Sequence, residues 1–298
     1  MKKLTWFFTL AVLLQGCAQD QSPTNASGSG TPPQTECTSQ ANYSNTQTSK
    51  FGHYVVTSDY QCNNANTIVV RELPATLAKD SQGIDYNSDL RIDRFYTVAK
   101  APDFQYAEVF VETTNTSKAP ICPRFDIELF GPAGKLVADG FAIEPVLASF
   151  DYWYYGWVCV GPGESALFHG GMVISEETVE RATLTPSFWQ APTHKPANYK
   201  LTSIALADNT LRVDFSLNHT TFAQSNHPRV LIQNADGYFV ASSISANHER
   251  TRVYLKSEAH YYASSSALSK LSQGDRIYIS PDLIPIELRG AQPSFVQQ

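Results

Sequence analysis

The sequence predicts an all-β protein of two tandem immunoglobulin-like β-sandwich units that follow a flexible N-terminal tether. Three observations support this prediction. Apolar and polar residues alternate over most of the chain, which is the period-two signature of strands. Turn residues separate these runs, and one set of strand and turn motifs occurs twice. Hydrophobic residues make up 42% of the 298 positions, which is enough for packed cores.

The alternating segments have clear ends. Residues 125–129 and 211–217 place apolar side chains at every second position. Glycine-bearing turns bound such segments, at 131–134, 161–163, 236–237 and 274–275. Helical periodicity is rare, and only residues 258–273 are expected to hold a short helix or helical turn.

One strand–turn motif recurs along the chain. The segment Pro123–Ile127 is echoed by Pro228–Ile232, 105 residues later. The turn that follows it, Gly134–Ala138, is echoed by Gly237–Ala241, 103 residues later. The repeat predicts that one sandwich unit is present twice.

Two further matches extend the repeat. The turn at residues 162–164 corresponds to the turn at 273–275. Upstream, the strand that ends at Asn115 corresponds to the strand that ends at Asn218. Chance similarity among β-strands is the alternative interpretation.

The repeat sets the expected domain boundaries. Residues 51–190 are predicted to form the first sandwich, and residues 198–290 the second. The first is expected to carry an extra N-terminal hairpin of His53–Thr57 and Thr67–Leu73, stapled by Cys62.

The first unit resembles the FxLyD family, an immunoglobulin-like domain of exported prokaryotic proteins. The matching residues are Phe125–Phe130, the turn to Gly134, and Gly161–Glu164 before a closing strand. The sequence departs from the family pattern at Gly131, where the family carries Asp. The resemblance implies a sandwich fold and an accessory, non-catalytic role.

The N-terminus has the layout of an export signal. Two lysines precede the apolar run Leu4–Leu14, and residues 14–17 read LQGC. This sequence resembles the lipobox of bacterial lipoproteins. The resemblance implies that residues 1–16 are a signal peptide and that Cys17 carries diacylglycerol and a fatty acid such as palmitate. The alternative is a plain secretory signal.

The residues after Cys17 indicate where the anchor lies. Ala18, rather than Asp, follows the cysteine, and the lipoprotein resemblance then implies the outer membrane, on its periplasmic side or exposed at the surface. Residues 17–50 are rich in Ser, Thr, Asn, Gln, Gly and Pro and contain no large aliphatic side chain. They are expected to form a flexible linker, because they cannot bury enough apolar surface.

Four cysteines remain after Cys17, namely Cys37, Cys62, Cys122 and Cys159. An even number in an exported protein predicts two disulfides. Of the three pairings, Cys37–Cys62 and Cys122–Cys159 are favoured because each pair is close along the chain. Free thiols are the alternative.

One loop has part of the spacing of a calcium site. Its oxygen-bearing side chains are Asp85, Asn87, Asp89 and Asp93. However, Leu90 and Tyr96 occupy the positions of the glycine and the bidentate glutamate of such loops. A polar loop with aspartates in turns is the competing interpretation, and no other cofactor is expected.

Residues 150–157 are the most aromatic segment of the chain. The candidate partner-binding residues are Phe150, Tyr152, Trp153, Tyr155 and Trp157. Exposed rings of this kind stack on sugars or anchor protein partners, whereas buried ones fill a core or an inter-unit contact.

The function predicted from the sequence is a non-catalytic, lipid-anchored binding or assembly module of the bacterial envelope, with another envelope protein as its partner. Binding of glycan or peptidoglycan through residues 150–157 is the alternative. An envelope hydrolase is third, because His169-Gly170-Gly171 has no nucleophile elbow beside it and Ser165 reads as a strand start. The net charge of -6 and pI near 5.6 argue against a nucleic-acid partner.

Overall fold

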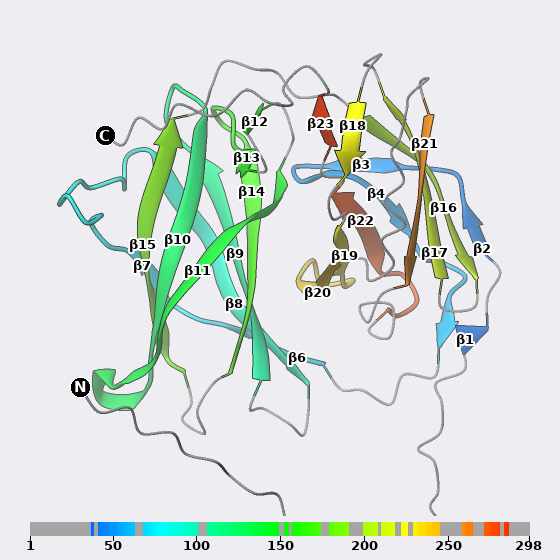
Figure 1. Cartoon of the computed structure of the whole chain (residues 1–298). Coiled ribbons are helices and arrows are strands. Elements are labelled where there is room, and N and C mark those ends of the chain that lie inside the picture. Colours follow the sequence, from blue (N-terminus) through cyan, green and yellow to red (C-terminus); the bar gives the residue numbers. More distant parts are fainter. Residues whose placement is uncertain are drawn as a thin grey trace, which may run out of the picture. The chain divides into compact units, whose positions relative to one another are not determined.

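The chain folds into antiparallel β-sheets, as the alternation predicts (Figure 1). The structure is a computed structural model. It describes residues 37–38, 41–62, 68–100, 106–148, 152–154, 157–173, 179–190, 199–207, 210–217, 222–225, 229–244, 258–264, 271–280 and 283–285, to which every structural statement below refers. Within these ranges the only helical element is the 3₁₀ turn Pro132–Gly134 (η1). The all-β class is therefore confirmed.

The first sandwich is an eight-stranded sheet that changes layer within one long strand. Its order is β6-β8-β9-β14-β11-β10-β15-β7, and only β15 and β7 pair in parallel. The strands are β6 (Ile68–Glu72), β7 (Ala75–Leu77), β8 (Leu90–Lys100), β9 (Tyr106–Asn115), β10 (Ile121–Phe130), β11 (Leu136–Ala148), β14 (Ser165–Val173) and β15 (Arg181–Gln190). The first part of β11 pairs with β10 and its last part with β14. Phe125 and Phe168 from these two layers meet in the core.

The second sandwich has a five-stranded and a four-stranded sheet, with orders β20-β19-β22-β4-β3 and β2-β16-β17-β21. Its strands are β2 (Ala41–Tyr43), β3 (Gln47–Ser49), β4 (Gly52–Val56), β16 (Tyr199–Ala207), β17 (Thr210–Leu217), β19 (Arg229–Gln233), β20 (Phe239–Ile244), β21 (Glu258–Ser264) and β22 (Arg276–Ser280). Three further two-stranded sheets pair β1 (Cys37–Thr38) with β5 (Gln61–Cys62), β12 (Tyr152–Tyr154) with β13 (Trp157–Cys159), and β18 (Phe222–Ser225) with β23 (Leu283–Pro285).

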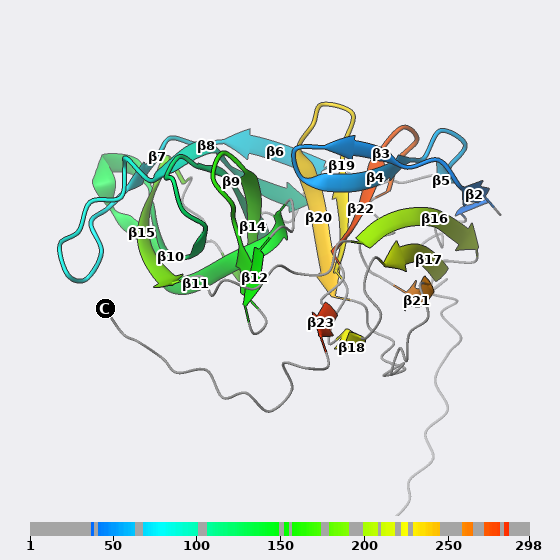
Figure 2. The same cartoon turned by 90° about the horizontal axis from the view of Figure 1, so that it is seen from above.

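The N-terminal strands belong to the second sandwich, which corrects two predictions. β4 pairs with β22, and β6 pairs with β8 of the first sandwich, so 53–57 and 67–73 do not form the expected hairpin. β2 and β3 also lie inside the expected linker 17–50. Figure 2 shows β3 and β4 beside β22. Alternation identifies a strand but not its partner, because pairing is decided by the tertiary structure.

The prediction of a helical turn in residues 258–273 is wrong for residues 258–264. Glu258–Ser264 is β21, which pairs with β17 along seven residues. Strand propensity and a neighbouring edge prevail here over a weak helical pattern.

The hairpins β10–β11 and β19–β20 are built alike. Phe130 pairs with Leu136 as Gln233 pairs with Phe239, and Leu129 pairs with Ala138 just as Ile232 pairs with Ala241. Both hairpins therefore correspond at one spacing of 103, and the spacing of 105 from the strand motif is wrong. The cause is the period of two, because a shift by two residues leaves the alternation unchanged.

The turn before β14 and the turn before β22 also make the same bonds. Gly163 N donates to Asn115 O at 2.8 Å, and Gly274 N donates to Thr57 O at 2.9 Å. Asn115 thus corresponds to Thr57, directly after β4, and not to the strand ending near Asn218. The second copy of this arrangement takes its strand from the N-terminal segment of the chain.

One hydrophobic cluster runs through both sandwiches. It joins Tyr96, Phe110 and Leu167 of the first sandwich to Phe239 and Tyr278 of the second. The described residues from Cys37 onward belong to one compact unit. The two sandwiches therefore share a hydrophobic core and are not independent domains joined by a linker.

A buried ion cluster lies beside this shared core. The Glu112 carboxylate is fully buried and pairs with the Arg94 guanidinium and with Lys50 Nζ at 3.2 Å. Lys50 comes from the second sandwich and the other two residues from the first. Burial, and secondarily the Glu112 charge, raise the pKa of the Tyr96 hydroxyl well above its usual value, so this hydroxyl stays neutral beside the cluster.

Candidate functional site: the stapled aromatic hairpin

The aromatic segment contains a short hairpin. In β12 and β13, Tyr152 lies opposite Cys159, Trp153 opposite Val158, and Tyr154 opposite Trp157. Of the candidate binding residues, Phe150 and Tyr155 lie outside the described residues. The aromatic residues are thus concentrated on one two-stranded element.

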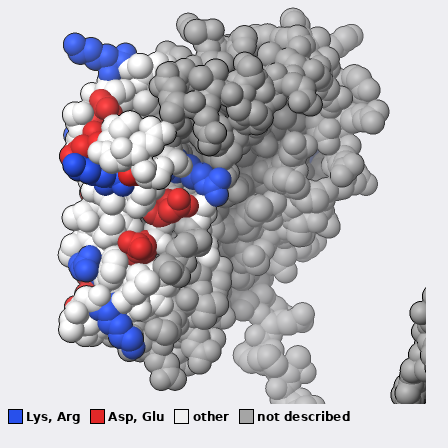
Figure 3. Space-filling model, turned by 60° about the vertical axis from the view of Figure 1, so that its left-hand side comes forward, with Lys and Arg blue, Asp and Glu red and all other residues white. Residues whose placement is uncertain are grey.

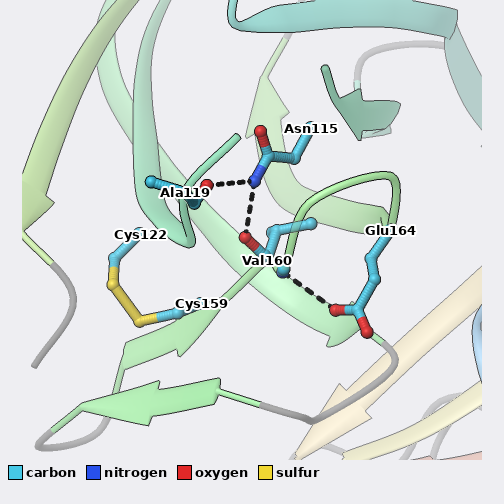
Figure 4. The surroundings of a disulfide bond; sticks show 7 residues. Asn115, Ala119, Cys122, Cys159, Val160 and Glu164 are labelled. Atoms are coloured by element: carbon cyan, nitrogen blue, oxygen red, sulfur yellow. Dashed lines mark hydrogen bonds between the residues drawn. A yellow bond between two sulfur atoms is a disulfide. The ribbon is translucent and has the colours of Figure 1, made fainter. Parts of the chain in front are cut away.

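A disulfide fastens the base of this hairpin to the first sandwich (Figure 4). Cys159, the last residue of β13, is bonded to Cys122 of β10, with Cα atoms 4.1 Å apart. Both residues are buried. This bond is one of the two pairs expected from the sequence.

A backbone bridge lies next to the disulfide. Ile121 N donates to Val160 O at 3.0 Å, and Val160 N donates to Ile121 O at 2.7 Å. Two adjacent residue pairs, one covalent and one hydrogen-bonded, therefore connect β13 and the residue after it to the start of β10.

Asn115 completes the attachment, and sequence reasoning missed this role. Its buried side chain donates from Nδ2 to Val160 O at 2.8 Å and to Ala119 O at 2.9 Å (Figure 4). Its Oδ1 accepts hydrogen bonds from the backbone N and the hydroxyl of Ser117. The Asn-Thr-Ser sequence is a local signal for such a side chain-capped turn, but it does not reveal the contact with Val160.

The turn after the hairpin is closed by its own side chain. Glu164 Oε2 accepts a hydrogen bond from Gly161 N at 2.8 Å, and Glu164 N donates to Gly161 O at 3.0 Å. Gly163 has a φ of 76°, a conformation that favours glycine. The hairpin base is therefore held by a turn, a bridge, an asparagine and a disulfide.

For the second expected cysteine pair, Cys37 and Cys62, the structure gives only the pairing of the backbone strands. Cys37 and Cys62 lie directly opposite each other in the β1–β5 pair. Their disulfide stays a prediction, and Cys17 lies outside the described residues.

The residues with calcium-loop spacing do not form a coordination shell in the structure. Asp93 accepts hydrogen bonds from Arg91 and from the Thr114 hydroxyl at 2.7 and 2.6 Å. Asp85 caps a local turn by accepting from Asn87 N at 2.9 Å, a bond that lowers the pKa of Asp85. Asp89 immediately precedes β8, and its backbone N donates to Tyr86 O. Among the described residues, no three His, Cys, Asp or Glu side chains are arranged to hold a metal ion.

The two residues considered for hydrolysis lie on β14. Ser165 is buried, and its hydroxyl lies 3.2 Å from the Thr114 hydroxyl. His169 Nε2 lies 3.3 Å from a Glu108 carboxylate oxygen, and its ring packs on Phe110. The histidine and the serine thus have separate partners.

Charges on the drawn face of the molecule are mixed. Figure 3 shows lysines, arginines and acidic residues interspersed on that face, with neither sign forming a continuous patch among the residues described there. No helix in the described part of the chain is long and apolar enough to span a membrane.

No protein-family model matches the chain, and no curated protein matches it. The likeness to the FxLyD family therefore stays a prediction from residues 125–164.

Proposed function

We propose that this chain is a non-catalytic, lipid-anchored binding or assembly module of the bacterial envelope, facing the periplasm from the outer membrane. The observation that supports a binding role most directly is the stapled hairpin. A short two-stranded element rich in aromatic residues is fastened to a rigid sandwich by the Cys122–Cys159 disulfide. Preorganised aromatic groups bind well because little conformational entropy is lost when a partner is engaged.

The anchor rests on the lipobox-like residues 14–17. A lipidated Cys17 would keep the module at the membrane surface, because each buried methylene contributes about 0.8 kcal/mol. Incorporation of labelled palmitate into the wild-type chain, and its loss in Cys17→Ser, tests this. A labelled Cys17→Ser chain would refute the anchor.

The partner is proposed to be another envelope protein. In-cell cross-linking of the full chain with mass spectrometry should yield one defined protein adduct. Trp153→Ala and Trp157→Ala should each reduce that adduct about tenfold, as expected for aromatic hot spots. The matched control is Tyr86→Ala, which removes a half-buried aromatic side chain from the loop between β7 and β8. Adducts unchanged in both tryptophan variants would contradict the hairpin as the binding element.

Glycan binding is the second candidate, since the same aromatic residues suit sugar stacking. Sedimentation of the chain with purified peptidoglycan distinguishes the two. Binding that is lost in Trp153→Ala and competed by glycan fragments would favour the glycan, whereas no sedimentation favours a protein partner.

A further inference from the structure

The second sandwich is completed by a segment that lies far from its other strands in the sequence. We define this donor segment as residues 37–62, which hold β1 to β5. In the five-stranded sheet, β4 lies between β22 and the segment's own β3. In the four-stranded sheet, β2 pairs with β16 at one edge. The donor segment therefore contributes strands to both sheets of the second sandwich.

The donor segment also fills part of the core of the second sandwich. Phe51 is buried, and its ring centre lies 5.4 Å from that of Phe239. Tyr54 of β4 packs on Tyr278 with ring centres 5.1 Å apart, and Val55 is fully buried in the same cluster. Without the donor segment, the remaining strands of the second sandwich would leave these apolar partners in water, so they cannot close a core on their own.

The turn before β22 holds the end of the donor segment. Thr57 N donates to Asp275 O at 2.9 Å, and Thr57 O accepts from Gly274 N at 2.9 Å. The Thr57 hydroxyl donates to Ser272 O at 2.9 Å. These bonds depend only on the segment and the turn. They are the same whether the segment comes from its own copy of the chain or from another copy.

The first sandwich, by contrast, is built from one continuous stretch of chain. The eight strands of its sheet lie between Ile68 and Gln190, and its disulfide lies in the same stretch. Among the described strands, none of the donor segment pairs with this sheet, and Lys50 contacts it through the side-chain ion pair with Glu112. The donor segment thus belongs structurally to the second sandwich, whereas the chain attaches it to the first through residues 63–67.

The donor segment is synthesised long before the strands that receive it. Those strands begin only at Tyr199, after the whole of the first sandwich. Residues 68–190 can fold around their own core before the receiving strands exist, since domains fold as units from the N-terminus onward. The donor segment then has to reach its place past a folded sandwich, and a neighbouring copy offers it the same contacts.

We infer that copies of this chain exchange their donor segments, so that residues 37–62 of one copy complete the second sandwich of another. The occupant is the segment that fills this place in the structure, and every copy carries it. Exchange keeps the contacts described above and alters only the connection through residues 63–67, which is why strand exchange is a low-cost route to a dimer. The inference depends on neither the aromatic hairpin nor the lipid anchor.

Cysteine trapping between two differently tagged full-length chains tests this inference. Asn42 of β2 lies directly opposite Ala205 of β16, so one chain carries Asn42→Cys and the other Ala205→Cys. The matched control is Asp126→Cys with Thr185→Cys, an opposite pair on β10 and β15 within the first sandwich. After co-expression and oxidation, we expect at least tenfold more disulfide-linked heterodimer from the first pair of chains than from the control pair.

Peptide mapping should place the new bond between positions 42 and 205 of different chains. The double variant Asn42→Cys/Ala205→Cys shows whether the same bond also forms within one chain. The inference is overturned by equal heterodimer yields from the two pairs, by a double variant that links only within one chain, or by a link from position 205 to a different protein.

The unmodified chain provides a second measurement, which no substitution can disturb. Size-exclusion chromatography with light scattering should find a dimer fraction that persists for hours after tenfold dilution, because separation of the copies requires the second sandwich to open. Refolding at high dilution should return this fraction as monomer. A chain that is monomeric at every concentration, or a dimer that dissociates within minutes of dilution, overturns the inference.

Discussion

The turn before β14 and the turn before β22 make the same four hydrogen bonds, yet they are held by different means. In the first, Asn115 at the end of β9 closes the turn, and its side-chain amide also reaches the hairpin base through Val160. In the second, Thr57 closes the turn and comes from a strand more than 200 residues earlier, with its hydroxyl donating to Ser272 O at 2.9 Å. A turn of this kind can pair with any strand end whose backbone N–H and C=O groups form hydrogen bonds with the turn's own backbone. The additional attachments of the first turn hold the aromatic hairpin. Among the described residues, the second turn has no such hairpin beside it.

Among changes that test the difference between the two turns, loss of the disulfide should lower the free energy of unfolding most. Replacing Cys122 and Cys159 together by Ala should lower the free energy of unfolding by about 3–4 kcal/mol, because the bond closes a loop of 37 residues in the unfolded chain. Urea denaturation of the oxidised proteins measures this. A loss below about 1 kcal/mol would mean that the bridge and Asn115 hold the hairpin base without the disulfide.

Asn115→Ala should have the next largest effect, about 2–3 kcal/mol. The change removes both Nδ2 hydrogen bonds, to the Val160 and Ala119 carbonyls, and also the Oδ1 acceptor of the Ser117 backbone N and hydroxyl. Thr57→Val is the matched control at the equivalent position and should lose only about 1 kcal/mol, because it removes a single hydroxyl. Equal losses in the two variants, measured by urea denaturation, would contradict the distinct role of Asn115.

Asp275, in the second turn, should make stability depend on pH. Burial raises the pKa of its carboxyl to about 6, although the bond from Ser272 N opposes the shift. The protonated form is therefore favoured in the folded state, and its stabilisation is complete below the unfolded pKa near 3.8 and is lost as the pH rises through 6. The loss should reach about 2 kcal/mol once solvent screening is allowed for. Asp275→Asn should flatten that segment of the stability–pH curve, and an unchanged curve would refute the assignment.

The glycines of the two turns should give the smallest effect. Gly163→Ala and Gly274→Ala each place a Cβ in the left-handed region, at φ 76° and 85°, with no other atom within 4 Å. Each should lose about 1 kcal/mol through backbone strain alone. Thermal melts of the two variants should agree, and a clear difference would show that the two backbones are not equivalent.

Local patterns predicted the strands and turns well. The alternation at 125–129 identified the core-facing residues of β10, and the glycines near 134, 163, 237 and 274 marked turns that require a positive φ. The Cys122–Cys159 pair was also predicted, from closeness along the chain. The aspartate spacing at 85–93 formed no metal-holding cluster among the described residues, because Asp85 accepts a turn amide and Asp93 accepts from an arginine.

The sequence by itself determined the all-β class, the positions of the tight turns and the repeated hairpin, since these depend on period-two patterning and on glycine, both local properties. Only the tertiary structure decided that β4 completes the second sandwich and that Thr57 and not residue 218 corresponds to Asn115. It also decided that the turn between β19 and β20 contacts the first sandwich, whereas the turn between β10 and β11 is exposed. The physical reason is that strand edges are chemically alike. Which edges meet depends on the packing of the whole chain around a shared core, and no short segment encodes it.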